Sequence, residues 1–402
     1  MQVLHFGAGN IGKGFIANVL SHNGFSVCFV DVDKTNIEAI RRDNKYQIEI
    51  LELSPKRLEI DNVFILDGLN EQQQIIDKII AVDLITTSVG VNNLVTIAPI
   101  IIKGLVHRFE RQNRPINIIA NENAINATNI LKKIIIEHLS KEHSEILPNI
   151  GFVNSAIDRQ AITQGEAGHA ITAVEPFWEW VINQKELVDN HLPKIVNVTY
   201  VDDLQPYIEK KLYIVNLGHA TLAYLGFVAN KSTILETLSI KVFRDFTQRV
   251  MQDSAKYLTE EYDFTQDYLF EYIENTLDRF ANPHLQDSVL RVAKSPIRKL
   301  SANERLIGPL SQLNNRHLPI NNLAKVIAMA LLFKAPQDSE SLELQHFIEQ
   351  YGVEKTICHY CQINDIKVIS IIKHYYMLFL LTTQKATEHN LDTQIEQILL
   401  NE

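Results

Sequence analysis

The chain is poor in cysteine, with three among 402 residues. So few cysteines cannot build the disulfide framework of a small secreted domain, and we expect a cytoplasmic protein in a reducing compartment. Cys358 and Cys361 form a lone C-x-x-C in a segment of helical character, away from any strand–helix–strand pattern, which favours two helical thiols over a redox pair. No cluster of Cys and His has the spacing of zinc ligands, so we expect no metal.

The sequence also lacks an excess of basic residues and long apolar runs. Its formal net charge of −10 argues against a general nucleic-acid binder. Runs such as Ala328–Phe333 and Met377–Leu381 are far shorter than the roughly 20 residues that span a bilayer, so we expect no membrane partner. The first apolar run leads directly into a glycine motif, so we expect no signal peptide. The pattern leaves a monomer and a small homo-oligomer equally open.

The first half of the chain alternates short apolar runs with amphipathic stretches such as Ile11–Ser21. This repetition is typical of a parallel, doubly wound sheet. A further strand is expected at Ala173–Trp180, near the end of the domain. The other expected strands are Val3–Phe6, Val27–Val30, Val63–Leu66, Leu84–Thr87, Asn117–Ala120 and Phe152–Asn154.

From about residue 200 the apolar periodicity becomes helical. A chain of 402 residues is too long for one typical core, so two domains are expected. We predict an α/β fold, with a Rossmann-type doubly wound parallel sheet over residues 1–195 and a mainly α-helical domain over residues 196–402. Residues 382–402 are expected to form an extra tail with a peripheral helix. The expected helices include Leu212–Val228, Thr233–Tyr257, Leu323–Phe333 and Val368–Leu381.

A glycine fingerprint, Gly7-Ala-Gly9-Asn10-Ile11-Gly12, follows the first expected strand and opens a helix. In that context the motif indicates a dinucleotide site. Gly7 permits a tight turn, Gly9 lets the backbone approach a pyrophosphate, and Gly12 allows close packing of the helix on the strand. The helix N-terminus offers free N–H groups to the phosphates. The alternative is a glycine-rich turn in an unrelated α/β protein.

Asp31 ends the second expected strand, where a carboxylate accepts hydrogen bonds from the adenine ribose hydroxyls. The same charge repels a 2′-phosphate, which favours NAD over NADP as the cofactor. Lys34 stands nearby and slightly weakens that inference.

Lys211, Asn216 and His219 stand at offsets of five and eight, within about 140° of one helical face. Beside a nicotinamide, such a face supplies a base for an alcohol proton and donors for the resulting carbonyl oxygen. A free lysine is protonated at neutral pH, so this role requires burial or a neighbouring positive charge to lower the pKa. Composition alone favours a solvated lysine and an ordinary packed histidine. Lys210, about 100° around the helix, is expected to tolerate replacement.

Motifs spread from Leu4 to Arg305 resemble the polyol-specific long-chain dehydrogenases, and among them those that act on mannitol 1-phosphate. Two positions depart from the family pattern: Gln160 stands where an aliphatic residue is usual, and Leu217 where Thr or Ser is common. The motifs are Leu4–Phe15, Thr86–Gly90, Ile119–Asn123, Asn154–Arg159, Val174–Trp180, Tyr207–Ala220 and Arg298–Arg305.

The resemblance implies roles for individual residues. Lys211 would be the general base, Asn123 and Asn216 would stabilise the alkoxide, and His219 would orient the reacting group. The implied cofactor residues are Gly7, Gly9, Asn10, Ile11, Gly12, Asp31, Thr87 and Val89, and the implied substrate residues are Asp158, Arg298, Lys299 and Arg305.

The chain also concentrates basic residues between Arg291 and Arg305. Guanidinium and ammonium groups are the usual partners of a sugar phosphate, although a run of charge is more often a solvated face. The resemblance implies an NAD-dependent, metal-free oxidoreductase that interconverts mannitol 1-phosphate and fructose 6-phosphate. Two alternatives stay open: a related polyol or hexuronate (fructuronate or tagaturonate) dehydrogenase, and a dinucleotide-binding sensor without catalysis.

Overall fold

The computed structural model describes the whole chain except residues 53, 166–170, 190, 286, 387–389 and 402. It divides into two compact units, Met1–Tyr207 and Ile208–Glu402. The domain boundary that the sequence predicts after residue 195 lies inside the first unit and remains a prediction. Each unit is described by itself.

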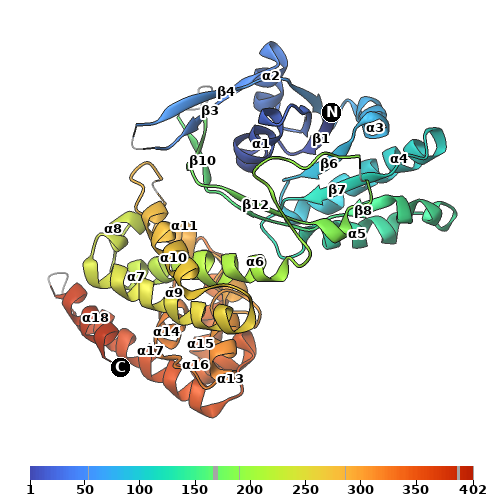
Figure 1. Cartoon of the computed structure of the whole chain (residues 1–402). Helices are drawn as coiled ribbons and strands as arrows, with labels where there is room; N and C mark the ends of the chain where they lie inside the picture. The colour runs from blue at the N-terminus through green and yellow to red at the C-terminus, as the bar shows by residue number, and fades with distance from the viewer. Residues whose placement is uncertain (53, 166–170, 190, 286, 387–389, 402) are drawn as a thin grey trace. The chain divides into compact units, whose positions relative to one another are not determined.

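A six-stranded parallel sheet forms the centre of the first unit, in the order β5-β2-β1-β6-β7-β8 (Figure 1). The order reverses at β1, as in a Rossmann-type doubly wound sheet, so the predicted fold class is confirmed. Each strand coincides with an expected one or overlaps it. The strands are β1 (Gln2–Phe6), β2 (Ser26–Asp31), β5 (Val63–Asp67), β6 (Leu84–Thr87), β7 (Ile116–Ala120) and β8 (Ile150–Phe152).

Alternating side chains of this sheet enter two different cores. Val3 packs with the first helix and α2, whereas Leu4 packs with α3, α4 and α5. This is the period-two pattern of a strand buried on both faces. The helices are η1 (Gly12–Ile16, a π turn), α1 (Ala17–His22), α2 (Lys34–Asp43), α3 (Gln72–Ala81), η2 (Val91–Asn93), α4 (Leu94–Arg111), α5 (Ala127–His138), η3 (Lys141–Asn149) and η4 (Gln184–Glu186).

Two smaller sheets complete the first unit, in the orders β10-β11-β3-β4 and β13-β12-β9. They correct the expectation of one strand over Ala173–Trp180, because β11 ends at Val174 and β12 begins at Glu179. Pro176 stands in the break, and proline cannot donate a ladder hydrogen bond. The strands are β3 (Tyr46–Ile50), β4 (Lys56–Ile60), β9 (Ser155–Asp158), β10 (Ala161–Gln164), β11 (Ile171–Val174), β12 (Glu179–Asn183) and β13 (Thr199–Val201).

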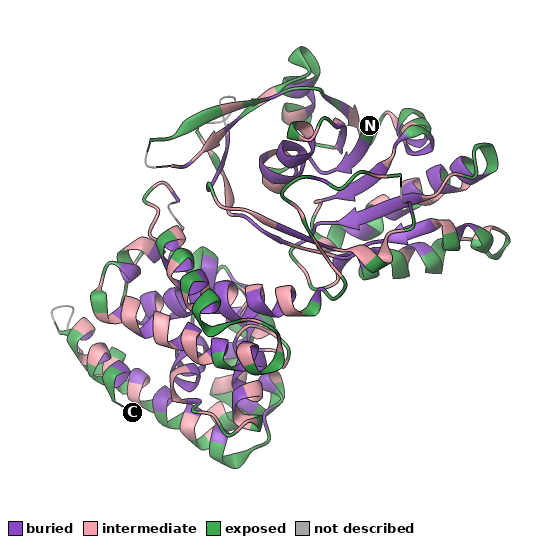
Figure 2. Cartoon of the chain, in the orientation of Figure 1, coloured by how far each residue is buried: buried purple, intermediate pink, exposed green. Residues whose placement is uncertain are grey.

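The second unit is helical, as predicted, and Figure 2 shows buried and exposed positions alternating along its helices. The helix expected over Thr233–Tyr257 is two helices, because Ile240 adopts an extended conformation between α8 and α9. The helices are α6 (Gln205–Lys210), η5 (Lys211–Asn216), α7 (Leu217–Val228), α8 (Ile234–Leu238), α9 (Lys241–Glu261), α10 (Gln266–Phe280), α11 (Val289–Ala293), α12 (Pro296–Lys299), α13 (Ile307–Asn315), α14 (Asn321–Leu331), α15 (Ser339–Tyr351), α16 (Val353–Thr356), η6 (Ile357–Cys361), α17 (Ile366–Lys385) and α18 (Leu391–Leu400).

The described part of the tail contributes to the core of the second unit. Its helix α18 buries Leu391, Ile395, Ile398 and Leu399. Lys325 of α14, 1% exposed, donates from Nζ to the carbonyls of Leu399 (3.3 Å) and Asn401 (2.6 Å). A lysine that binds the last carbonyls also suits the negative end of the helix dipole.

Helix α17 is, among the described residues, the one that is long and apolar enough to cross a membrane by length and composition. The mean hydropathy of its apolar window is 1.2, and 28% of that window is buried. One such helix is weak evidence for a membrane span. In this structure α17 packs against α14 and buries Val368, Ile372 and Phe379.

Candidate active site

The glycine loop joins β1 to the first helix with little room for side chains. Gly7 has φ of +103°, and a Cβ there would lie 2.7 Å from the carbonyl oxygen of Ser88. A Cβ at Gly12 would collide with the carbonyl oxygen of Gly7. At Gly9, by contrast, a Cβ would meet nothing within 4 Å. The loop is therefore crowded where it turns and open at its tip, beside the start of a helix.

Asp31 holds this loop from the end of β2. One carboxylate oxygen accepts from the backbone N–H of Ala8 at 2.5 Å, and the other accepts from Val32 and Asp33 at 2.7 and 2.8 Å. The predicted ribose acceptor therefore also fixes the glycine loop, a task that sequence reasoning did not anticipate.

A hollow of about 820 Å³ adjoins the tip of the loop. Lys13 lies in it and donates to Asn36 at 2.8 Å. Burial lowers the pKa of Lys13, against the opposing effect of Asp31 and Asp33. Carboxylate, ammonium and amide groups therefore line this hollow, next to the uncrowded backbone of Gly9. Its lining includes Ala8, Gly9, Asn10, Lys13, Asp33 and Asn36.

Glu122 organises the loop that follows β6. Its carboxylate, 7% exposed, accepts from the Thr87 hydroxyl at 2.8 Å and from the backbone N–H groups of Val89 (3.1 Å) and Gly90 (2.6 Å). Asn123 is the next residue and is exposed. Sequence reasoning passed over Glu122, although it stands inside the quoted Asn121-Glu-Asn123 motif. The structure therefore ties the positions predicted for the cofactor, Thr87 and Val89, to the segment that carries Asn123.

His5 connects the ends of β1 and β6 and was also missed. Its ring nitrogens lie 2.6 Å from the Thr86 hydroxyl and 2.8 Å from the Ser88 hydroxyl. Burial lowers the pKa of His5 to about 3, so the ring is neutral and takes no part in charge binding.

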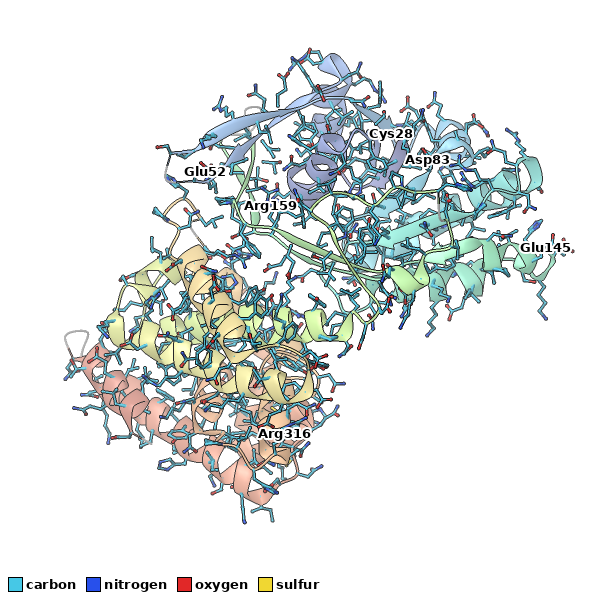
Figure 3. All side chains as sticks on the ribbon, viewed as in Figure 1. Cys28, Glu52, Asp83, Glu145, Arg159 and Arg316 are labelled. Carbon is cyan, nitrogen blue, oxygen red and sulfur yellow. The ribbon has the colours of Figure 1, made fainter. Side chains whose placement is uncertain are left out.

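Asp158 and Arg159 lie at the end of β9 and are 6% and 8% exposed. The guanidinium of Arg159, which is labelled in Figure 3, donates to the carbonyls of Glu175 (3.1 and 3.0 Å) and Gly14 (2.9 Å). Burial lowers the pKa of Arg159 to about 10. Arg159 therefore joins the small sheets to the first helix, beside the predicted substrate residue Asp158.

The helix that carries Lys211, Asn216 and His219 contains a π turn over Lys211–Asn216, with α7 continuing from Leu217. In a π turn the backbone hydrogen bonds join residues five apart, so Lys211 and Asn216 lie closer together around the helix axis than in an α-helix. An ideal α-helix would separate them by about 140°. All three side chains are half-buried, and such turns occur often at functional sites.

Lys210 occupies a different environment from its neighbour. It is fully buried, donates to the Tyr268 hydroxyl at 2.9 Å, and lies 4.5 Å from the centroid of the Tyr272 ring. Removing this side chain would leave a hole among aromatic rings. The expectation that Lys210 tolerates replacement is therefore contradicted by its packing.

His219 is paired with Asp287, a residue that sequence reasoning did not select. Its Nε2 lies 3.0 Å from an Asp287 carboxylate oxygen, and its ring stacks on Phe280 at 4.7 Å between centroids. Burial lowers the pKa of His219; Asp287 acts against this, and Arg291 and Arg305 reinforce it.

Arg298 and Arg305 share one carboxylate. Each contacts Glu304 at 2.9 Å, and their side chains are 49% and 12% exposed. Lys299 is 4% exposed and donates to the carbonyl of Lys294. Burial lowers the pKa of Lys299 to about 7, with Arg305 and Arg298 adding to the effect. The structure thus brings the predicted phosphate residues together, with Lys299 turned to the backbone.

Over the described part of the chain, no three His, Cys, Asp or Glu side chains form a group that could hold a metal ion. Cys358 is exposed and Cys361 is buried, and both are free thiols near η6. The predicted catalytic residues divide between the units: Asn123 lies in the first, and Lys211, Asn216 and His219 lie on one helix of the second.

Two family models match the chain: the mannitol dehydrogenase Rossmann domain over residues 1–195 and the mannitol dehydrogenase C-terminal domain over residues 203–380. The mannitol-1-phosphate 5-dehydrogenase of Geobacillus stearothermophilus is 38% identical over 93% of this chain and 98% of its own. The enzyme of the same name from Enterococcus faecalis is 36% identical over 93% and 97%.

Solved structures resemble the whole chain in fold. The mannitol 2-dehydrogenase of Pseudomonas fluorescens, in a ternary complex with NAD and D-mannitol, matches with a TM-score of 0.79 and 16% identity over 100% of this chain and 95% of its own. A substrate-free D-sorbitol dehydrogenase matches with a TM-score of 0.81 and 13% identity over 99% and 94%. Identities this low speak for the fold alone.

Proposed function

The chain belongs to the mannitol dehydrogenase family, and on that premise we propose that it is an NAD-dependent oxidoreductase that interconverts D-mannitol 1-phosphate and D-fructose 6-phosphate. The observation that carries the proposal is an identity of 36–38% with mannitol-1-phosphate 5-dehydrogenases over more than nine tenths of both chains. The reaction uses a side-chain base and no metal.

The residues of the first unit fit a dinucleotide. Gly9 leaves open space at the start of a helix, where backbone N–H groups bind phosphate. Asp31 stands at the end of β2 to accept the ribose hydroxyls, with Asp33 in the adjoining hollow. The cofactor also contacts the two segments that follow β1 and β6, through Asn10, Ile11, Thr87 and Val89. Bound NAD accepts the hydride from the alcohol carbon, and NADH returns it.

The helix of the second unit supplies the proton chemistry. Lys211 takes the hydroxyl proton during oxidation of the alcohol and returns it during reduction of the ketone. Asn216, one π turn further along, donates to the oxygen as negative charge develops on it, and Asn123 has the same role. His219 orients the reacting group.

Arg298 and Arg305 bind the sugar phosphate. Each guanidinium has five N–H donors, so the contact with Glu304 leaves donors for a phosphate. Lys299 adds positive charge behind them when it is protonated, and Asp158 contacts the sugar. The protein acts in the cytoplasm, as a monomer or a small homo-oligomer.

Two other functions compete with this proposal. A dehydrogenase for a free polyol or a hexuronate needs no phosphate site, so the shared contact of Arg298 and Arg305 argues against it. A sensor without catalysis does not need a lysine and an amide close together on one helix. The pair Lys211 and Asn216 therefore argues against a sensor.

The test compares ketose substrates with the purified protein. NADH oxidation, followed at 340 nm, should proceed with fructose 6-phosphate and be slower by orders of magnitude with fructose, fructuronate or tagaturonate. Equal rates with fructose would support the free-polyol alternative. Tight NADH binding without turnover on any of these substrates would support the sensor.

A further inference from the structure

The environment of His219 fixes both the plane and the direction of its ring. Phe280 stacks on it with an angle of 18° between the ring planes, and Asp287 binds the Nε2 edge at 3.0 Å. The side chains of His219 and Asp287 are 19% and 11% exposed, so water competes little for this contact. One ring nitrogen is therefore committed to a carboxylate, and the other is left for a different partner.

Asp287 is itself held in place. Its carbonyl accepts from the N–H of Ile234 at 2.9 Å, and Arg291 donates from Nε to the carboxylate oxygen opposite the one that faces His219, at 2.5 Å. Burial alone would raise the pKa of Asp287, but the hydrogen bonds from His219 and Arg291 hold it below its usual range. The partner of His219 is thus a fixed, ionised acceptor.

The charges around His219 favour the neutral imidazole. Burial lowers its pKa, Asp287 opposes this, and Arg291 and Arg305 lower it further. A neutral imidazole has one N–H, and a carboxylate accepts only. The proton must therefore lie on Nε2, which leaves the lone pair on Nδ1.

We propose that Asp287 is a positioning residue that fixes His219 in the tautomer with a protonated Nε2, so that Nδ1 acts as a hydrogen-bond acceptor for a substrate hydroxyl. Arg291 fixes which carboxylate oxygen faces the histidine. The inference deepens the role of His219 in the proposed function and rests on it. It assigns His219 as an acceptor, whereas Asn216 donates to the alkoxide.

Asp287→Asn provides a directed test, because Arg291 determines how the amide turns. The amide oxygen is the one acceptor available to Arg291, so the NH₂ group faces Nε2 and forces the proton onto Nδ1. We expect kcat to fall on the order of 10²-fold, the upper end of the usual loss when a group that orients a functional histidine is removed, with KM for NADH unchanged. Asp245→Asn is the matched control, since Asp245 pairs with the exposed Lys241 on α9.

The double variant Asp287→Asn with Arg291→Ala separates tautomer from structure. Without Arg291 the amide can turn its oxygen to Nε2, so this variant should recover at least several-fold of the kcat lost by Asp287→Asn. A purely structural role predicts a further loss, which would overturn the proposal. Arg291 is 63% exposed, so its truncation leaves no buried cavity.

A spectroscopic measurement tests the inference without turnover. The ¹⁵N chemical shifts of the His219 ring, assigned with His219→Gln, should report a protonated Nε2 in the wild type and a protonated Nδ1 in Asp287→Asn. A protonated Nδ1 in the wild type would overturn the inference. Absence of activity with fructose 6-phosphate would contradict the proposed function and leave this measurement intact.

Discussion

The first unit fixes its candidate cofactor loops through backbone amides, whereas the second fixes its candidate catalytic groups through other side chains. Asp31 and Glu122 each accept from several N–H groups of a loop after a strand. In the second unit, Asp287 aligns His219 and Glu304 joins two arginines. A carboxylate is the anchor in both units, but the group that it anchors differs.

This difference explains why the candidate cofactor site is easier to predict from the sequence than the candidate catalytic site. A site built from backbone needs glycine where the chain turns sharply or packs closely, and glycine is visible in a sequence. A site built from side chains needs contacts between distant residues, such as His219 with Asp287, which no local pattern records. The predictions below remove one anchor or one anchored group at a time.

The largest effect is expected at the candidate base. Lys211→Met should lower kcat for alcohol oxidation by about 10²- to 10⁴-fold, the usual contribution of a general base, because the methionine cannot take the proton. NADH binding, measured by fluorescence titration, should change less than two-fold. The control is Lys241→Met, whose side chain is 86% exposed. Turnover within a few-fold of the wild type would exclude Lys211 as the base.

The strands of the Rossmann-type sheet could be predicted because each contains a short apolar run next to a helix, as in Val27–Val30 within β2. The smaller sheets could not, since β4 is mostly exposed and β10 has four residues, most of them half-buried, so neither forms a buried apolar run. Helical periodicity did not predict the π turn, which brings Asn216 closer to Lys211 around the helix axis than α-helical spacing does. Lys210 looked like Lys211 in sequence, and only tertiary packing separates them.

The next largest effect is expected at the two arginines that share Glu304. Arg305→Ala should reduce kcat/KM for fructose 6-phosphate by roughly 10- to 150-fold, since a hydrogen bond to a charged group contributes about 1.5–3 kcal/mol. Arg298→Ala should cost less, because its side chain is 49% exposed against 12% for Arg305. Activity with fructose, measured in parallel, should change little. Equal losses on both substrates would mean that the arginines support the fold rather than the phosphate.

A smaller effect is expected at Asp31. Asp31→Asn removes the charge and keeps one of the two oxygens that accept from the loop amides, so the ratio of kcat/KM for NADPH to that for NADH should rise about 10-fold, equivalent to about 1.4 kcal/mol. Asp33→Asn is the informative comparison, because Asp33 is exposed, lines the hollow beside the glycine loop and caps α2. A larger shift in Asp33→Asn than in Asp31→Asn would move the discriminating charge to Asp33.

The smallest effect on turnover is expected at Lys325, a buried lysine whose ammonium donates to backbone carbonyls and has no proposed role in the reaction. Lys325→Met keeps the volume and removes the ammonium that donates to Leu399 and Asn401 at the end of α18. The hydrogen bond to the Leu399 carbonyl is buried, so its loss leaves a buried acceptor without this donor, and the free energy of unfolding should fall by about 1–3 kcal/mol. Proteolysis between α17 and α18 should become faster, while kcat and both KM values stay within two-fold. A loss of kcat/KM for fructose 6-phosphate comparable to that of Arg305→Ala, without a loss of stability, would mean that the contact between Lys325 and α18 acts on the reaction. The side chains that hold the site of the second unit would then extend as far as α18.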